Sequence, residues 1–359
     1  MVAAMRRLLP MLAACAVTLG SCSTTAPRQQ VRQATYANPV LDADFPDPAV
    51  LKAADGFYYA YATQTQRGES WLNMQVARSA DLVRWDHLGD ALPVKPVWAS
   101  KTQDFWAPHV HEAGGRYYLY YSAKPDAALT DDKRGLCLAV ATATSPRGPF
   151  TDMGKPLLCG EGFVNIDPMS YDDPATGKRL LYWGSGFQPI KVQELGADRM
   201  SFAPGSAPID LVPAIKDDPK RYSRLVEGAW ITRRGDFYYM FYSGDNCCGK
   251  DAHYAALVAR SRSATGPFET LEQATGAANS VILESRGHWF APGHNAVVSD
   301  AAGQDWMVYH AVDTRRPRTR PTDDVNTRRV MLIDRIVWIN GWPRVLGDGP
   351  STSPQPVPR

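Results

Sequence analysis

The sequence predicts an all-β protein built as a five-bladed β-propeller. A strand-like motif, in which a glycine precedes an aromatic and aliphatic run, occurs five times. The copies begin at Gly56, Gly115, Gly177, Gly235 and Gly303, at intervals of 59, 62, 58 and 68 residues. A turn glycine followed by such a run is a strand signature, and recurrence at a steady period indicates a repeat architecture. No long segment shows a sustained helical period.

The copies themselves predict strands that are buried on both faces. They read Gly56-Phe-Tyr-Tyr-Ala-Tyr-Ala, Gly115-Arg-Tyr-Tyr-Leu-Tyr-Tyr-Ser, Gly177-Lys-Arg-Leu-Leu-Tyr-Trp-Gly-Ser, Gly235-Asp-Phe-Tyr-Tyr-Met-Phe-Tyr-Ser and Gly303-Gln-Asp-Trp-Met-Val-Tyr-His. Their hydrophobicity is continuous rather than alternating, as in strands covered on both sides.

A second set of motifs indicates several strands in each unit. Val76-Ala-Arg-Ser, Val140-Ala-Thr-Ala and Val258-Ala-Arg-Ser follow their copies by roughly 20 residues, and two of them lead into Gly148-Pro-Phe and Gly266-Pro-Phe. Units of this kind match the antiparallel blades of a propeller. A solenoid and a β-sandwich with coincidental hairpins are the alternatives, and five copies with atypical ends fit a closed ring better.

The N-terminus has the pattern of an export signal. Arg6 and Arg7 precede an apolar run over residues 8–19, which is short for a membrane span, and Leu19-Gly20-Ser21-Cys22 follows. This end resembles a bacterial lipobox, in which Cys22 becomes the lipidated first residue; an ordinary cleaved signal is the alternative. We expect a signal peptide over residues 1–21, a tether over 22–35, a propeller domain over 36–350 and a C-terminal tail over 351–359. The mature protein would be an exported lipoprotein, periplasmic or at the outer membrane or cell surface.

Composition limits the partners. Lys and Arg total 39 against 37 Asp and Glu, so the net charge of +2 favours neither nucleic acid nor an anionic membrane surface. We expect a monomer that touches the membrane only through the lipid on Cys22. Export permits disulfides, and Cys137 with Cys159 is a plausible bridge, whereas the redox state of the adjacent Cys247 and Cys248 is open. No Cys and His spacing of the zinc type is present.

Three acidic residues occupy the same phase of the repeat. Asp47 lies nine residues before Gly56, Asp167 lies ten before Gly177, and Glu227 lies eight before Gly235. The second unit has Trp106-Ala-Pro-His109 at this phase, and the fifth has Gly293-His294-Asn295. If the blades are equivalent, these positions meet at one mouth of the central channel.

A cluster of carboxylates in a cleft suits acid and base chemistry. Burial and mutual repulsion raise the pKa of one group while another stays ionised. Hydrolysis of a glycosidic bond needs this division, because one acid protonates the leaving oxygen while another group activates water or attacks. Phe45 and Trp106 beside the acids could offer apolar faces to sugar rings, although either could equally be a core residue. We also expect His109 and Arg329 to contact the substrate.

At these residues the chain resembles glycoside hydrolase family 43, which includes arabinanases, α-L-arabinofuranosidases and β-xylosidases. Three segments carry the likeness over about residues 36–345: Asn38-Pro-Val-Leu-Asp-Ala-Asp-Phe-Pro-Asp-Pro, Asn165-Ile-Asp-Pro with Tyr171-Asp-Asp-Pro-Ala-Thr-Gly-Lys, and Val226-Glu-Gly-Ala-Trp. The resemblance implies that Asp47 is the general base, that Asp167 tunes the pKa of the acid and orients it, and that Glu227 is the general acid. Glu-Gly-Ala stands where Glu-Gly-Pro is frequent in the family.

Finer features are similar to the arabinanase-like branch. They are Cys247-Cys248, Ala291-Pro-Gly-His294-Asn, Tyr309-His-Ala and the segment Arg329-Val-Met-Leu-Ile-Asp-Arg-Ile-Val-Trp-Ile-Asn-Gly-Trp-Pro. In that branch the histidine that matches His294 lies near a structural calcium ion on the propeller axis and holds it partly through water. One imidazole is limited support for a cation that prefers oxygen ligands.

The resemblance implies an inverting hydrolase of arabinose-containing plant polysaccharide, most similar to an arabinan endo-1,5-α-L-arabinosidase. An exo-acting α-L-arabinofuranosidase or a β-xylosidase is the alternative activity, because no residue decides between endo and exo cleavage. An inactive carbohydrate-binding propeller would lack at least one acid, and all three are present. Fructan and sucrose hydrolases carry a different aspartate motif, sialidase turns are missing, and WD-type blades are shorter.

Overall fold

The computed structural model describes residues 1, 34–127, 135–184, 186–319 and 327–359. Apart from Met1, the predicted signal peptide, Cys22 and nearly all of the predicted tether lie outside the described residues. None of the helices that the structure describes has the length and apolar character needed to cross a bilayer.

Five antiparallel sheets follow one another along Ala34–Arg359, as the repeat predicts, and each forms one blade. The first three have the strand orders β2(Ala49–Lys52)–β3(Tyr58–Ala62)–β6(Gln75–Ser79)–β7(Asp86–Asp90), β8(Phe105–Ala113)–β9(Arg116–Ala123)–β10(Cys137–Ala143)–β11(Thr151–Asp152) and β13(Met169–Asp172)–β14(Arg179–Trp183)–β15(Lys191–Glu194)–β16(Ile209–Asp210). The last two are β17(Val226–Arg234)–β18(Phe237–Asn246)–β19(His253–Ser261)–β20(Glu269–Thr270) and β22(Trp289–Ser299)–β23(Asp305–Asp313)–β24(Arg329–Ile339)–β25(Trp342–Val345).

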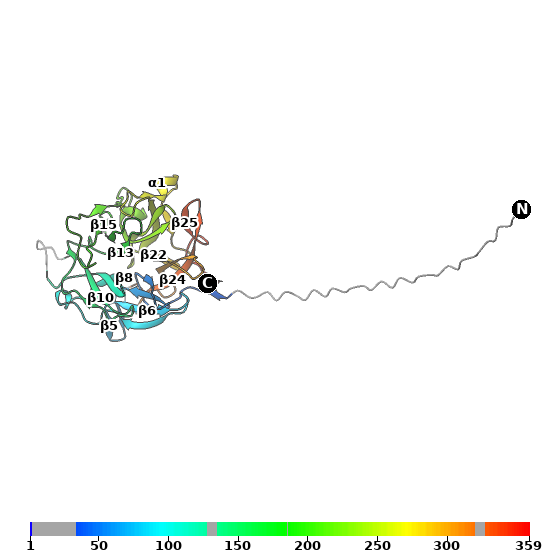
Figure 1. Ribbon diagram of the computed structural model, residues 1–359. Helices are drawn as coiled ribbons and strands as arrows, with labels where there is room; N and C mark the ends of the chain where they lie inside the picture. The colour runs from blue at the N-terminus through cyan, green and yellow to red at the C-terminus, as the bar shows by residue number, and fades with distance from the viewer. Residues whose placement is uncertain (2–33, 128–134, 185, 320–326) are drawn as a thin grey trace. The chain divides into compact units, whose positions relative to one another are not determined.

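Short elements are attached to these sheets. They are the hairpin β4(Thr65–Arg67)–β5(Ser70–Leu72), strands β12(Leu158–Cys159) and β21(Val281–Leu283) on the second and fourth sheets, the 3₁₀ turns Val97–Ala99 and Tyr222–Arg224, and the helix α1(Leu271–Thr275). In Figure 1 the first strands β8, β13 and β22 lie near the middle of the ring, while β10 and β25 lie farther out. Each blade therefore presents its first strand to the central channel.

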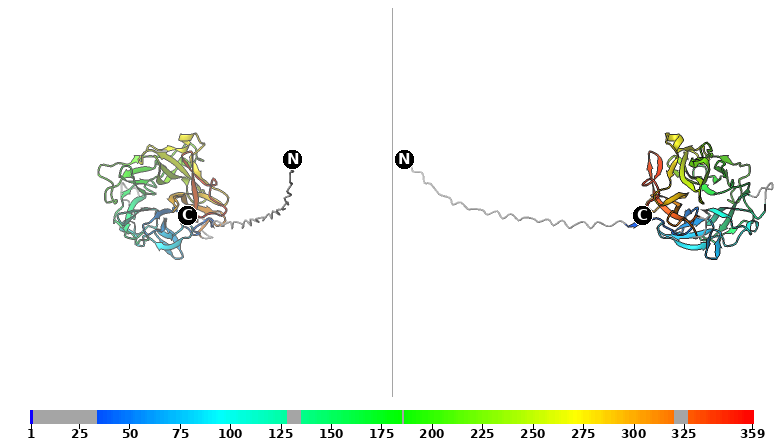
Figure 2. Two further views of the ribbon diagram at one scale, coloured as in Figure 1. Left: turned by 45° about the vertical axis from the view of Figure 1, so that its right-hand side comes forward. Right: turned by 180° about the vertical axis from the view of Figure 1, so that it is seen from behind.

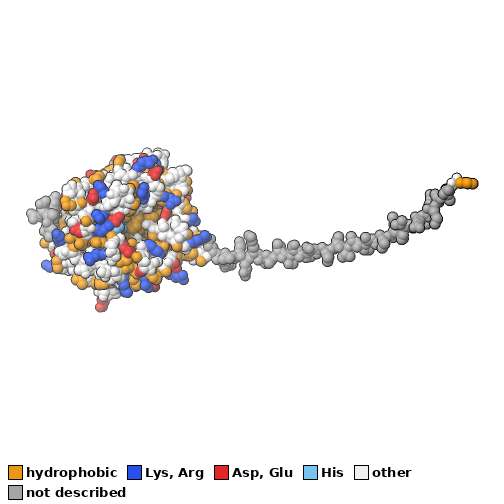
Figure 3. Space-filling view, viewed as in Figure 1, with side chains coloured by type: hydrophobic (Ala, Val, Ile, Leu, Met, Phe, Trp, Pro, Cys, Tyr) orange, Lys and Arg blue, Asp and Glu red, His pale blue; other side chains and the backbone are white. Residues whose placement is uncertain are grey.

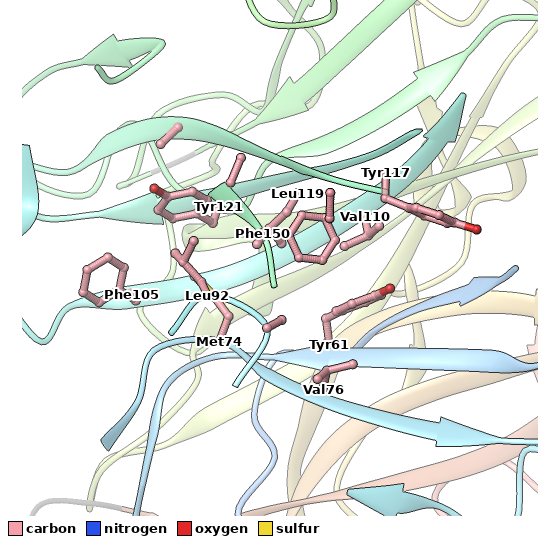
Figure 4. Close-up of a cluster of buried hydrophobic side chains, with 14 of the residues drawn as sticks. Tyr61, Met74, Val76, Leu92, Phe105, Val110, Tyr117, Leu119, Tyr121 and Phe150 are labelled. Atoms are coloured by element: carbon pink, nitrogen blue, oxygen red, sulfur yellow. The ribbon is translucent and has the colours of Figure 1, made fainter. Parts of the chain in front are cut away.

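The second strand of each blade explains the aromatic repeat. In β3, Tyr59 and Tyr61 pack into a cluster shared with the second blade, while Tyr58 and Ala60 pack into a cluster shared with the fifth. Successive side chains of a strand point to opposite faces, and here both faces are covered by neighbouring blades. Figure 4 shows the cluster between blades one and two, where Tyr61 lies close to Tyr117 and Phe150.

The ring is closed between its first and last blades. The segment before β2 runs along β24, where Val40 N–H donates to the Met331 carbonyl at 3.0 Å and Phe45 N–H to the Arg329 carbonyl at 2.8 Å. The blue strands of blade one and the orange strands of blade five lie side by side in Figures 1 and 2, in agreement with their shared apolar cluster. This closure brings residues near position 47 beside residues near position 329.

The predicted C-terminal tail over residues 351–359 is bound to the propeller. Strand β26(Gln355–Pro356) pairs with β1(Thr35–Tyr36), so the last residue of the predicted tether also belongs to the folded unit. Ser351 N–H donates to the Asp334 carboxylate at 3.1 Å, and Arg359 N–H donates to Asp300 at 2.9 Å. Two-residue strands of this kind have no strand signal in the sequence, because they lack a periodic apolar run.

The surface carries charges of both signs. On the face seen in Figure 3, lysine and arginine side chains are interspersed with aspartate and glutamate. A mixed surface of this kind creates no strong field of one sign, in line with the net charge of +2.

Candidate active site

At one shared phase, the first strand of each blade is interrupted, or preceded, by a residue in the left-handed backbone region; the first strand of blade five has a second such residue, Ala291 (φ 48°). The residues at the shared phase are Asp47 (φ 57°), Ala107 (φ 46°), Asp167 (φ 56°), Gly228 (φ 60°) and His294 (φ 45°). The ladders of blades two, four and five shift register at these points. Left-handed non-glycine residues carry strain of order 1–3 kcal/mol and gather at functional sites. The common phase predicted from the sequence is therefore a common backbone feature.

Polar side chains of the preceding blade hold four of these left-handed residues in place. Each accepts a hydrogen bond from the backbone N–H of the next blade: His310 Nδ1 from Asp47 at 3.0 Å, Thr63 from Ala107 at 2.8 Å, Ser122 from Asp167 at 3.0 Å and Ser243 from His294 at 2.7 Å. In blade four the N–H of Gly228 instead donates to the Asp167 carboxylate. The hydrogen bonds between blades thus fix the strand interruptions that carry the acids.

The predicted acids meet in one cavity of about 810 Å³. Its wall contains Asp47, Asp167 and Glu227, together with His294 and Arg329. All five blades contribute to this wall, because the shared phase places each contribution at the same mouth of the channel. The prediction that these side chains converge is confirmed.

Asp47 is buried and held as an anion. Its carboxylate contacts Arg329 Nη1 at 2.9 Å and accepts the Thr63 hydroxyl hydrogen bond at 2.6 Å. Burial is the largest single influence and raises the pKa of Asp47, but Arg329, His294 and His310 together outweigh it and hold that pKa well below the usual value. His310 Nδ1 accepts the Asp47 N–H, and burial lowers the His310 pKa to about 4, so this ring is neutral near pH 7. Arg329 is therefore the cation that keeps Asp47 charged.

Glu227 has the opposite electrostatic environment. It lies on β17 opposite Ser243, and the Tyr254 hydroxyl donates to its Oε1 at 2.7 Å. Burial raises the pKa of Glu227 to about 7, the Tyr254 hydrogen bond acts against this rise, and the Asp47 charge adds to it. Glu227 can therefore hold a proton at pH values where Asp47 has lost its own.

Asp167 joins these two groups. Burial raises its pKa well above the usual value, and the charge of Glu227 raises it further. Gly228 N–H, next to Glu227, donates to the Asp167 carboxylate, which ties Asp167 to the strand of the acid. Because both pKa values are raised, Asp167 and Glu227 together retain a proton at neutral pH.

His294 lies between the carboxylates. Its Nδ1 is 3.6 Å from Asp47 Oδ1 and 3.9 Å from Asp167 Oδ2. A Cβ added to Gly228 would lie 3.2 Å from this imidazole nitrogen, so the position next to the acid needs glycine both for space and for its φ of +60°.

The residues present do not make a metal site by themselves. Among the described residues, no group of three or more His, Cys, Asp or Glu side chains is placed to hold a metal ion. The carboxylates beside His294 are engaged by Arg329, Thr63 and Gly228. Calcium at His294 thus stays a prediction, and no chemical step below uses a metal.

Two of the predicted substrate-binding residues lie elsewhere. Phe45 is fully buried in the cluster between blades one and five, with its ring edge-on to His87, and offers no face to a sugar. His109 is also buried and lines a separate cavity of about 610 Å³, where its ring packs against Trp230. Both predictions are wrong, because adjacency to an acid in sequence does not decide which side of the strand a side chain takes.

The other two lie in the acid-lined cavity. Trp106 is part of its wall and stacks on Phe163, with ring centroids 5.8 Å apart and planes inclined by 6°. Arg329 is also in the wall and pairs with Asp47. Its backbone N–H donates to the half-buried Asp44 at 3.0 Å, which the sequence analysis did not identify.

Residues on the second and third strands also escaped the sequence analysis. Tyr254, on β19, had no distinguishing signal. Thr63, Ser122, Ser243 and His310 did have one, since a polar residue recurs seven or eight residues after each of these turn glycines. The break in an otherwise apolar run marks the point where the strand accepts a hydrogen bond from the left-handed residue of the next blade.

Comparison with known proteins places the chain among carbohydrate-active enzymes. A family model described as "Glycosyl hydrolases family 43" matches residues 36–343. The chain is 29% identical to a probable arabinan endo-1,5-alpha-L-arabinosidase A of Aspergillus flavus over 86% of this chain and 94% of that protein. It is 25% identical to an extracellular exo-alpha-(1->5)-L-arabinofuranosidase of Cellvibrio japonicus, over 78% and 84%.

Solved structures agree on the architecture. A thermostable family-43 glycoside hydrolase superposes with a TM-score of 0.71 at 28% identity, covering 90% of this chain and 99% of that one. An alpha-L-arabinanase of Cellvibrio cellulosa, complexed with arabinohexaose, superposes with a TM-score of 0.66 at 23% identity, covering 84% and 95%. The second likeness shows the shared fold alone.

Proposed function

Because the chain belongs to family 43 of the glycosyl hydrolases, we propose that it cleaves α-1,5 bonds within arabinan with inversion at the anomeric carbon. The observation that carries this proposal is that, within one cavity, the pKa of Asp47 is lowered while the pKa of Glu227 is raised. Arg329 holds Asp47 ionised, while burial raises the pKa of Glu227 to about 7. A glycosidase that inverts needs such a pair, one carboxylate as base and one carboxylic acid as proton donor.

In this mechanism Asp47 takes a proton from a water molecule, which attacks the anomeric carbon of the bound sugar. Glu227 protonates the departing glycosidic oxygen as its bond to the anomeric carbon breaks. Because the water attacks from the opposite face, the configuration at that carbon inverts. The two carboxyl groups should be about 6.5–9.5 Å apart to leave room for the water. Thr63 and Arg329 orient Asp47, and neither needs to move during the reaction.

Asp167 acts on Glu227 as an orienting and pKa-tuning group. Its link to Gly228 N–H fixes the backbone beside the acid, and its proximity makes a second negative charge on Glu227 unfavourable. This keeps the proton on the pair until the leaving oxygen takes it.

The pH profile should follow from these two displaced pKa values. Glu227 acts in its protonated form, so kcat/KM should fall as pH rises through about 7. Asp47 acts ionised, so the acid limb should lie below its usual value of 3.8. Tyr254→Phe should move the alkaline limb to higher pH, because the lost hydrogen bond favoured the Glu227 carboxylate. A shift to lower pH in the variant would contradict the assignment of the acid.

The arabinan substrate is supported by the relatives, whose names include both endo and exo action on 1,5-linked arabinose. Incubation with linear 1,5-arabinan, arabinoxylan and xylan, followed by chromatography of early products, tests it. We expect a ladder of arabino-oligosaccharides from arabinan and much slower release from the other two. Free arabinose as the sole early product would establish the exo alternative, and xylose release would establish a xylosidase.

An inactive carbohydrate-binding propeller is the alternative of another class. It has no need for an ionised and a protonated carboxyl side by side, and burying such groups costs stability. Binding of arabinan without any hydrolysis over days would favour it.

We also propose that the mature enzyme is exported and carries a lipid on Cys22. The proposal rests on Arg6, Arg7 and the run that ends at Leu19-Gly20-Ser21-Cys22. The Cys137–Cys159 disulfide, which the sequence left as a plausible bridge, suits an oxidising compartment. The mass of the N-terminal peptide from a membrane extract tests the proposal, and an unmodified Cys22 would refute it.

A further inference from the structure

Cys247 and Cys248 form a disulfide between adjacent residues, and both half-buried side chains lie in the wall of the acid-lined cavity. We propose that this disulfide is a sugar-binding surface, on which the apolar face of a sugar unit beyond the cleaved bond packs. The proposal rests on the proposed function, since it assigns a contact to the same polysaccharide substrate.

The position of the disulfide separates it from the reacting atoms. Ser243 on β18 lies opposite Glu227, and three further residues of that strand follow before Cys247. Three residues of extended strand span ~10 Å. Along the strand the disulfide is therefore displaced from the acid, and we place a neighbouring sugar unit, rather than the cleaved bond, beside it.

Its chemistry differs from that of the surrounding wall. The two sulfur atoms carry no charge and no N–H or O–H group, and they are polarisable. Around them the wall is polar, with Arg224, Asp245, Asn246 and Thr327. A sugar ring has a C–H face and a rim of hydroxyl groups. An apolar patch framed by polar side chains is the arrangement that binds such a ligand.

The surface is also held rigid. Cys247 packs on a small apolar cluster of Ala252, Tyr254 and Ala291. Asn246 Nδ2 donates to the carbonyls of Cys248 and Asp251, both at 3.1 Å. Gly249 N–H donates to Thr327 of the next blade at 3.5 Å. A preformed surface loses little conformational entropy when the sugar binds, so its contact area contributes more fully to affinity.

The second disulfide offers a matched control. Cys137–Cys159 joins β10 to β12 on blade two, and neither residue lies in the wall of the acid-lined cavity. Loss of this bond removes a covalent link without changing the sugar-binding wall.

The double variant Cys247→Ser/Cys248→Ser tests the proposal with linear arabinohexaose and 4-nitrophenyl α-L-arabinofuranoside. The KM for the hexaose should rise about tenfold, equivalent to about 1.4 kcal/mol. This factor should be at least about five times the factor by which the KM for the aryl glycoside rises, because the aryl glycoside has no further sugar unit. Cys137→Ser/Cys159→Ser should retain the wild-type hexaose KM. A rise by the same factor for both substrates, or no rise, would overturn the proposal.

A second measurement covers the case in which the double variant fails to fold. In the Cys137→Ser/Cys159→Ser protein, a water-soluble phosphine reduces the remaining pair: the phosphorus gains an oxygen from water and two thiols form. The hexaose KM should rise about tenfold and recover on reoxidation. If both thiols are titrated and the KM is unchanged, the role of the disulfide is refuted while the proposed function stands. If the wild-type protein leaves the hexaose intact, the proposed function is refuted.

Discussion

Replacing Glu227 with alanine should lower kcat on linear arabinan by about a thousandfold, within the range of general-acid contributions. The alkoxide that leaves from arabinan needs a proton, and Glu227, whose pKa is raised to about 7, is the group assigned to supply it. On an aryl arabinofuranoside with a 2,4-dinitrophenyl leaving group the loss should be about tenfold or less, because this leaving group departs as an anion. The ratio of the two losses is the measurement.

A control for this variant is Glu269→Ala on the same blade. Glu269 is an exposed carboxylate paired with Arg260 at 2.8 Å, and an exposed ion pair contributes little to stability. We expect wild-type kinetics from it. Equal losses on arabinan and on the aryl glycoside in Glu227→Ala would contradict the acid assignment.

Replacing Asp47 with asparagine should lower kcat by about ten-thousandfold on both substrates. The attacking water needs a base to take its proton, whichever leaving group departs. The amide keeps the shape of the carboxylate but cannot accept the proton. The substrate independence of this loss distinguishes Asp47 from Glu227.

The same substitution should also reduce stability. It leaves the Arg329 guanidinium without its anion at a site where both side chains are largely buried, and such a loss costs about 3 kcal/mol. The double variant Asp47→Asn/Arg329→Met should recover part of the melting temperature while its activity stays low. Recovery of activity along with stability would show that Asp47 serves the fold rather than the reaction.

The sequence predicted the blades because each strand's burial is recorded in a short continuous run of residues. Tyr58, Tyr59, Ala60 and Tyr61 are apolar in sequence because two neighbouring blades cover the strand from opposite sides. The turn glycine before each run completes the signal. A ring closed on itself then requires residues of equal phase to meet at one mouth, so the convergence of Asp47, Asp167 and Glu227 could be predicted without coordinates.

What could not be predicted depends on contacts between blades. Phe45 and His109 are close in sequence to site residues, but Phe45 packs between blades one and five and His109 lines the other cavity. Arg329 reaches Asp47 only because β24 runs beside the N-terminal segment. The pKa values follow from such pairings. The physical reason why Asp47 is the base and Glu227 the acid is therefore visible only in the folded structure.

The stereochemistry of the first product tests the central claim most directly. Proton NMR during early hydrolysis of α-1,5-linked arabino-oligosaccharide, before mutarotation, identifies the configuration of the new reducing end. Direct attack by a water activated at Asp47 predicts that the β anomer forms first and the α anomer appears later. An α anomer as the first product would mean retention, and would contradict the assignment of Asp47 as a base acting on water.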